Sequence, residues 1–207
     1  MSSDDAPKVD FESLLSRPLR WPKVGDKLFA PASAWHGNAV VTQSPRSRLA
    51  IMVRGYKVAA DVLVERATAS RGDRDFLVFP IIFNYRQFIE LELKYILATY
   101  GPSVGVPAVW NSHGLAALWM KVQEVFEAYD GLETDNANAA VSALIAEFDQ
   151  VDPGSFTYRY PVDTKGRPMD VAFEHVDLAA LADVMEGLEG YFNGWDGFLD
   201  NLRSAAP

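Results

Sequence analysis

Three charged residues at four-residue steps, Arg86, Glu90 and Lys94, form the pattern in this sequence best suited to chemistry. On a helix this spacing puts Glu90 within one turn of both cations. An arginine in a polar furrow can grip phosphate or carboxylate through its planar fork. The same spacing also fits a solvated face whose ion pairs contribute little to stability. The pattern leaves both interpretations open.

A candidate acid–base group follows at His113. Ser112 is a suitable N-cap, which predicts His113 in the first turn of a helix, where the dipole disfavours a charged imidazole. A neutral imidazole can act as a base or contact a ligand, although such a residue can also merely cap or pack. Because a short loop favours antiparallel neighbours, we expect His113 to meet Glu90 or Lys94 rather than Arg86.

A third candidate is the sequence Tyr158-Arg159-Tyr160. Strand-like alternation predicts both tyrosines on one side and Arg159 on the other. Aromatic rings beside an arginine can stack nucleic-acid bases, or they can pin a loop to the core.

If these three stretches meet at one site in the folded protein, some of their residues would be catalytic and the others would bind the ligand. Arg86 would hold phosphate, Glu90 would orient it and His113 would be the base, and the ligand would also contact Lys94, Tyr158 and Arg159. We then expect Glu90 and Lys94 to lie in or beside a pocket that His113 or Arg159 reaches.

Metal and cofactor signatures are missing from the sequence. It has no cysteine, and its histidines, His36, His113 and His175, are far apart. Histidine or thiolate metal clusters are therefore not expected. Neither glycine-rich phosphate loops nor HExxH and GxSxG motifs occur. We expect no metal and no cofactor.

The stretch from Phe76 to Tyr100 is the one around which the chain is organised. Apart from the polar arc of Arg86, Gln87, Glu90 and Lys94, it is apolar on most of its circumference. A helix of this kind has to be wrapped by other helices. We expect Phe88, Leu91 and Tyr95 to be almost fully buried.

The rest of the chain predicts an all-α, up-and-down helical bundle. Apolar residues at three- and four-residue steps indicate helices at 45–70, 74–100, 112–129, 135–150 and 177–202, with Ser44, Asp73, Thr134 or Asp135, and Asp177 as further caps. Pro80 predicts a kink or a late start of the second helix. Residues 156–173 read as a short hairpin-like excursion with a turn at 163–166.

Residues 1–44 are interrupted by prolines but carry many large apolar side chains, which indicates an irregular arm packed on the helical domain, residues 45–207, or on a partner. Gly187, Gly190, Gly194 and Gly197 share an arc of the last helix. They indicate either close approach by another helix or a frayed helix. With the arm, they favour a homodimer.

Charge and hydropathy limit the ligands and the cellular location that we expect for this protein. The net charge is −9, made up of +4 over residues 1–74 and −13 over residues 75–207. This argues against wrapping of long nucleic acid but permits a local anion site. The acidic start MSSDDAPK does not fit a secretory signal, and no apolar run is long enough to span a bilayer. We expect a cytoplasmic protein without membrane contact.

FNYRQFIELELKYIL, the helix start HGLAALW and the later YRYPVDTKG resemble uncharacterised bacterial proteins related to the HEPN superfamily. The resemblance covers about residues 45–200. It implies a helical-bundle domain of the kind found in toxin–antitoxin, phage-defence and RNA-processing systems. Active members cleave RNA without metal through an arginine followed by four to six residues and a histidine. Here Leu91, Glu92 and Leu93 stand where that histidine would follow Arg86.

The resemblance thus implies a bacterial defence or stress protein that binds or acts on RNA or a nucleotide. Two alternatives remain open on the sequence. The chain can be a non-catalytic interaction module, antitoxin-like or a dimeric scaffold, or it can bind a small anionic ligand.

Overall fold

A computed structural model describes residues 20–41, 44–129 and 136–205. The chain divides into two units, residues 1–41 and 42–207. In the described part of the first unit, the 3-10 turn η1 (Trp35–Gly37) is the only helical element. Trp21, Phe29 and Trp35 are 73%, 96% and 79% exposed, so residues 20–41 form no apolar core of their own. Packing of the arm on another surface stays a prediction.

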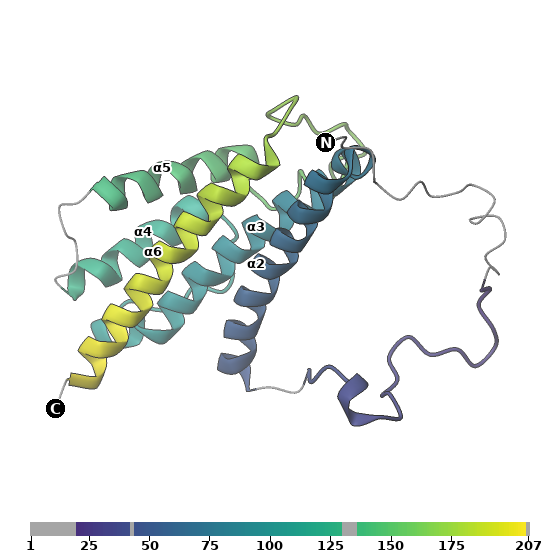
Figure 1. Cartoon of the computed structure of the whole chain (residues 1–207). Coiled ribbons are helices and arrows are strands. Elements are labelled where there is room, and N and C mark those ends of the chain that lie inside the picture. Colours follow the sequence, from purple (N-terminus) through teal and green to yellow (C-terminus); the bar gives the residue numbers. More distant parts are fainter. Residues whose placement is uncertain (1–19, 42–43, 130–135, 206–207) are drawn as a thin grey trace, which may run out of the picture. The chain divides into compact units, whose positions relative to one another are not determined.

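The second unit confirms the all-α, up-and-down bundle (Figure 1). Its described residues contain no strand. The helices α2, α4 and α6 contact α3, and α5 contacts α4. The elements are α2 (Pro45–Ala69), α3 (Arg71–Thr99), η2 (Gly101–Val104), α4 (Leu115–Ala128), α5 (Asn136–Val151) and α6 (Leu178–Ala205).

Two of the expected caps are present. The Ser44 Oγ accepts a hydrogen bond from the Ser47 N–H at 3.2 Å, with Pro45 in the first helical position of α2. The Asp177 carboxylate accepts hydrogen bonds from Ala179 and Ala180 at the start of α6. Both side chains satisfy N–H groups that the helix itself leaves open. The caps proposed at Thr134 and Asp135 lie outside the described residues.

The central helix α3 begins earlier than predicted. Ser70, not Asp73, is its N-cap residue, and the helix runs through Pro80 instead of starting near it. The Asn84 side chain donates a hydrogen bond to the Pro80 carbonyl at 2.7 Å. Proline costs about 3 kcal/mol inside a helix, and the burial of α3 on three sides offsets that cost.

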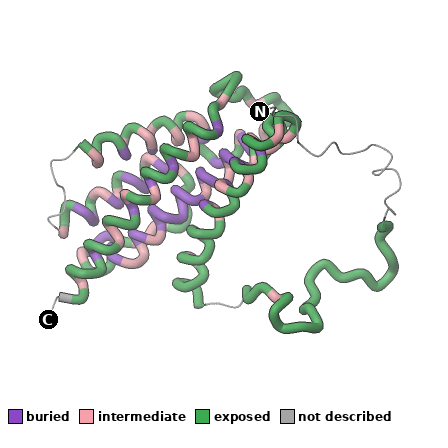
Figure 2. Tube along the Cα trace, viewed as in Figure 1, coloured by how far each residue is buried: buried purple, intermediate pink, exposed green. Residues whose placement is uncertain are grey.

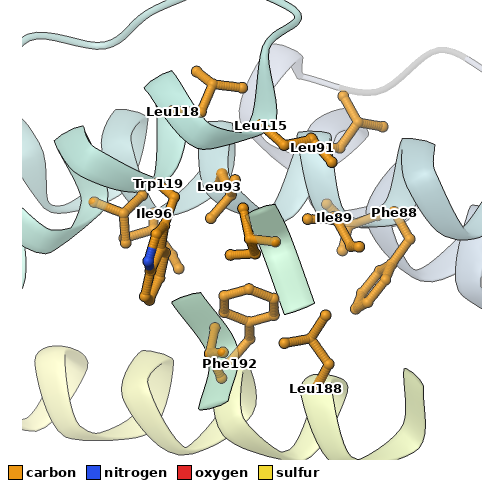
Figure 3. Close-up of a cluster of buried hydrophobic side chains, with 14 of the residues drawn as sticks. Phe88, Ile89, Leu91, Leu93, Ile96, Leu115, Leu118, Trp119, Leu188 and Phe192 are labelled. Carbon is orange, nitrogen blue, oxygen red and sulfur yellow. The ribbon is translucent and has the colours of Figure 1, made fainter. Parts of the chain in front are cut away.

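Buried residues concentrate on α3 (Figure 2), as expected for a central helix. Phe88 and Leu91 are buried, at 2% and 8% exposed, but the prediction for Tyr95 was wrong because it is only partly buried, at the edge of a cavity. Leu188 and Phe192 of α6 point into the cluster formed by α3 and α4 (Figure 3). The Phe192 ring meets Phe88 edge to face, with centroids 6.4 Å apart.

The glycine arc of α6 does not face another helix of this chain. A Cβ added at Gly187, Gly190, Gly194 or Gly197 would meet nothing within 4 Å. Close helix approach is therefore not their role within the described part of the chain. A homodimer stays a prediction.

The excursion after α5 is hairpin-like, as predicted. Val162 and Pro168 form an isolated antiparallel bridge. The turn between them has Gly166 at a φ of +75°, a left-handed conformation that glycine adopts without strain. The Asp163 carboxylate accepts hydrogen bonds from the Lys165 and Arg167 N–H groups, which satisfies the turn locally.

The core predicts the cost of one truncation. Phe88→Ala should lower the free energy of unfolding by roughly 3–5 kcal/mol, because it removes a buried ring and leaves a cavity. Urea denaturation measures this. Phe76, which is 60% exposed on the same helix, is the matched control, and Phe76→Ala should change stability by about 0.5 kcal/mol or less. Equal costs for the two variants would show that α3 is not the central helix.

Candidate functional site

The polar arc of α3 is buried. Arg86, Glu90 and Lys94 are 0%, 2% and 5% exposed, and Asp152, just after α5, is 1% exposed. We call these four side chains the buried ion cluster. The interpretation of the arc as a solvated face is therefore wrong. The spacing on α3 is the one that suits surface ion pairs, but the loop before α4 and the end of α5 cover this arc.

Arg86 joins three elements. Its Nε donates to the Asp152 carbonyl at 2.9 Å, its Nη1 to Glu90 Oε2 at 2.9 Å, and its Nη2 to the His113 carbonyl at 2.7 Å. The Asp152 carboxylate lies 3.5 Å from Nε. Each guanidinium nitrogen thus donates to the protein, and a phosphate would have to displace these partners to bind Arg86. The geometry makes Arg86 a positioning residue.

Glu90 lies at the centre of the cluster. Its Oε1 accepts a hydrogen bond from Lys94 Nζ at 2.8 Å and lies 2.9 Å from His113 Nδ1. Burial by itself raises the pKa of the Glu90 carboxyl, but the hydrogen bonds from Lys94, His113 and Arg86 outweigh it. The pKa is therefore held below its ordinary value of 4.5, and Glu90 is ionised at neutral pH.

The expected contact between His113 and Glu90 is present, but the placement of His113 in a helix was wrong. Gly114 is the N-cap residue of α4, so His113 belongs to the preceding loop. The Asp149 carboxylate of α5 accepts a hydrogen bond from the Leu115 N–H at 2.6 Å and caps α4 from outside. The dipole argument for His113 therefore does not apply.

His113 is the exposed end of the cluster, with its side chain 63% accessible. Nδ1 faces Glu90, and Nε2 forms no hydrogen bond within the described part of the chain. A carboxylate behind one ring nitrogen fixes the tautomer and the orientation of the ring. The contact with Glu90 therefore leaves Nε2 as the outward-facing ring nitrogen of His113.

The loop that carries His113 is anchored at both ends. At its start, a Cβ at Gly101 would lie 2.4 Å from the Val106 carbonyl oxygen, so only glycine permits this close approach. Lys94 Nζ donates to the Trp110 carbonyl at 3.3 Å, and Arg86 donates to the His113 carbonyl. The two buried cations of α3 thus hold the backbone of residues 110–113.

Trp110 is a residue that the sequence analysis missed. Trp110 is 57% exposed, although Lys94 Nζ donates a hydrogen bond to its backbone carbonyl. Trp110 shares an anchored loop with the exposed His113, and loops held by a rigid scaffold carry many of the binding residues of proteins. A tryptophan three residues after Pro107 and directly before Asn111, in the irregular stretch VPAVWNSHG, was the signal that could have identified it.

Tyr158 and Arg159 lie elsewhere. Residues 157–159 form a turn rather than an extended segment, and Tyr158 is buried while Tyr160 is 50% exposed, so the predicted alternation is wrong. The Arg159 guanidinium lies over the rings of Phe83, Phe156 and Tyr160, 4.9–5.6 Å from their centroids. Tyr158 and Arg159 line a cavity of about 380 Å³ that none of Glu90, Lys94 or His113 lines. Arg159 therefore packs the segment after α5 against Phe83 of α3.

Within the described ranges, no group of three or more His, Asp or Glu side chains is placed to hold a metal ion. The described helices also include none with the length and apolar character needed to cross a membrane. The protein is thus a helical bundle in which a buried ion cluster holds the loop at residues 110–113 in place. Comparison with protein-family models, with curated proteins and with solved structures found no match.

The cluster predicts how stability depends on pH. Glu90→Gln should lower the free energy of unfolding by roughly 3–5 kcal/mol at neutral pH, because it leaves two cations with one buried carboxylate. The pKa of Glu90 is lower in the folded than in the unfolded state, so its contribution is present above about pH 4.5 and is lost as the pH falls through the folded-state pKa. The difference between wild type and variant should therefore shrink in acid.

Urea denaturation across this pH range measures the difference. The matched control is Glu124→Gln, which removes a surface pair with Lys121 and should change stability by about 0.5 kcal/mol or less. A Glu90→Gln variant as stable as wild type at neutral pH would contradict the assignment.

Proposed function

We propose that this chain is a HEPN-like bacterial defence or stress protein that binds RNA or a nucleotide at residues 110–113. One observation carries the proposal. Two buried cations anchor the backbone of this loop, and the loop exposes an indole at Trp110 and a carboxylate-oriented imidazole at His113. The resemblance of residues 45–200 to HEPN domains favours RNA as the ligand.

The two exposed groups fit the two parts of a nucleotide. Every base offers a π-face, and stacking of a base on an aromatic side chain contributes about 1–3 kcal/mol. With Nδ1 facing Glu90, the Nε2 of a neutral His113 accepts a hydrogen bond from a ribose hydroxyl, whereas it donates to a phosphate oxygen only when the ring is protonated. Because the loop backbone is already held in place, binding orders few additional groups.

The charge of the chain limits the length of the ligand. With a net charge of −9, it repels a long polyphosphate. Affinity for duplex nucleic acid comes mainly from lysine and arginine at phosphates, and Arg86 and Lys94 are occupied inside the protein. The site therefore fits a nucleotide or a short single-stranded segment.

For RNA cleavage, His113 is the candidate base. It would remove the proton from the ribose 2′-hydroxyl, and the 2′-oxygen would bond to the adjacent phosphorus while the bond from phosphorus to the 5′-oxygen breaks. The products would be a 2′,3′-cyclic phosphate and a 5′-hydroxyl, with the leaving oxygen taking its proton from water or from the protonated His113, and no metal is needed for that step. Among the residues of the anchored loop, His113 is the one acid–base group exposed at its tip. Binding is therefore the core of the proposal, and cleavage is an additional outcome of its test.

A non-catalytic interaction module is the second candidate, and the contacts of Arg86 favour it. All three of its guanidinium nitrogens donate to protein atoms. In this alternative the buried ion cluster only fixes the loop and the end of α5, and Trp110 contacts a protein partner. The two candidates differ in whether an isolated nucleotide ligand binds.

Anisotropy of a fluorescein-labelled single-stranded RNA of about ten nucleotides at low salt tests the proposal. Trp110→Ala should weaken binding by about tenfold, the loss expected for one stacked base. His113→Ala should weaken binding as well, and the same samples assayed for cleaved RNA should show no cleavage for this variant.

Phe76→Ala and His175→Ala are the matched controls. Phe76 is an exposed aromatic residue 18 positions before Lys94 on α3, which corresponds to about 27 Å along the helix. His175 is exposed and lines a different cavity. Both variants should bind like wild type. Equal affinity for Trp110→Ala and wild type, or no RNA binding by wild type, would rule out the proposal and favour the interaction module.

A further inference from the structure

A second cluster of charges surrounds a cavity of about 350 Å³ between α2, α3 and α6. The lining residues include none of the buried ion cluster, so the inference below is independent of the proposed RNA site. Four carboxylates line the cavity, from all three helices: Asp61, Glu92, Glu189 and Asp196.

The one buried cation at this cavity is already paired. Lys57 is 2% exposed, and its Nζ lies 2.8 Å from Asp61, 3.2 Å from Glu189 and 3.4 Å from Glu186. Burial lowers the pKa of Lys57, but hydrogen bonds with Asp61 and Glu189 outweigh it and raise the pKa above 10.5. The lysine is therefore charged, and carboxylates remain in excess around it.

Glu92 has no partner among the residues that the structure describes. It is 9% exposed, it lines the cavity, and its carboxyl receives no hydrogen bond from the described part of the chain. Burial, together with the charges of Asp196 and Glu189, raises its pKa to about 7. The side chain is largely buried, but its carboxyl oxygens stay accessible from the cavity. Facing a cavity, it indicates a position at which a ligand supplies the missing cation.

The charged groups around Glu92 come from every helix that packs there. They are Arg54, Lys57 and Asp61 of α2 and Glu186, Glu189 and Asp196 of α6, and the titratable but uncharged Tyr95 of α3 lies beside them. Arg54 is exposed at the rim and forms no ion pair with the described residues. The walls between the charges are aromatic, because Phe88, Tyr95 and Phe192 line the same cavity.

The spacing of the carboxylates fits an extended organic cation better than a metal ion. Glu189 and Asp196 are seven residues apart on α6, which places them about 10 Å apart along the helix axis. Glu92 lies near enough to both for their charges to raise its pKa. A metal ion needs a compact set of ligands, and no such set occurs among the described residues. Spaced negative charges with aromatic walls between them suit a chain of ammonium groups joined by methylenes.

We propose that this cavity binds a linear aliphatic polyamine. Its ammonium groups contact Glu92, Glu189 and Asp196, and its methylene chain packs against Phe88, Tyr95 and Phe192. Binding a cation favours the ionised form of Glu92, so the polyamine displaces the proton of this carboxyl.

Isothermal titration of the full-length protein with spermidine tests this. We expect Glu92→Gln, which keeps the shape of the side chain and removes its charge, to weaken binding at least tenfold. At neutral pH the wild type should release about half a proton per spermidine, seen as a difference in heat between buffers of different ionisation enthalpy. Glu92→Gln should release none.

Three comparisons complete the test. Glu124→Gln, which removes a surface carboxylate on α4, should bind like wild type. Butylamine, with one ammonium group, should bind at least tenfold more weakly than spermidine. If Glu92→Gln does not fold, Asp196→Asn replaces it with the same expected loss. Three results would overturn the proposal. They are equal affinity of Glu92→Gln and wild type for spermidine, equal affinity of the wild type for spermidine and butylamine, and no spermidine binding at millimolar concentration.

Discussion

The fold depends on the hydrogen bonds of one buried arginine. Arg86 connects the central helix to the turn after α5 and to the loop before α4, and Glu90, Lys94 and Asp152 balance its charge. Apolar contacts would also fill this space, but they have no preferred direction, whereas hydrogen bonds do. Two carbonyl groups of the loop are fixed by this means, at Trp110 and His113. Desolvating such charges is costly, so the cluster contributes position more than net stability.

Helix periodicity and local caps were enough to predict most of the fold. Apolar spacing placed five helices, and Ser44 and Asp177 marked the starts of two of them. The start of α4 was missed because its cap, Asp149, comes from another helix. The burial of Arg86, Glu90 and Lys94 was not predictable either, because charges four residues apart are the usual pattern of a solvated helix face. Trp110 was missed because exposure of a loop residue depends on tertiary contacts.

The central helix carries polar groups on two opposite arcs. Arg86, Glu90 and Lys94 follow one another at about 40° intervals around the axis, and Glu92 lies across the helix from them. On the first arc each charge has a partner, and Arg86 and Lys94 also hold the loop at residues 110–113 in place. On the second arc Glu92 has none within the described residues, and the outcome is a cavity with an unpaired carboxyl. The same helix thus carries paired charges that fix a loop on one side and an unpaired carboxyl that faces a cavity on the other.

The glycines of α6 bear on how that cavity is reached. Gly187, Gly190, Gly194 and Gly197 face open space, and each weakens the helix by about 1 kcal/mol relative to alanine. The helical state of α6 therefore depends on Leu188, Phe192 and Leu199, which pack against the core. Because α6 also supplies one wall of the cavity, partial fraying of this helix would admit a ligand while α3 and its neighbours stay folded. The glycine content of α6 thus lowers the free energy of local opening there, separately from the stability of the whole domain.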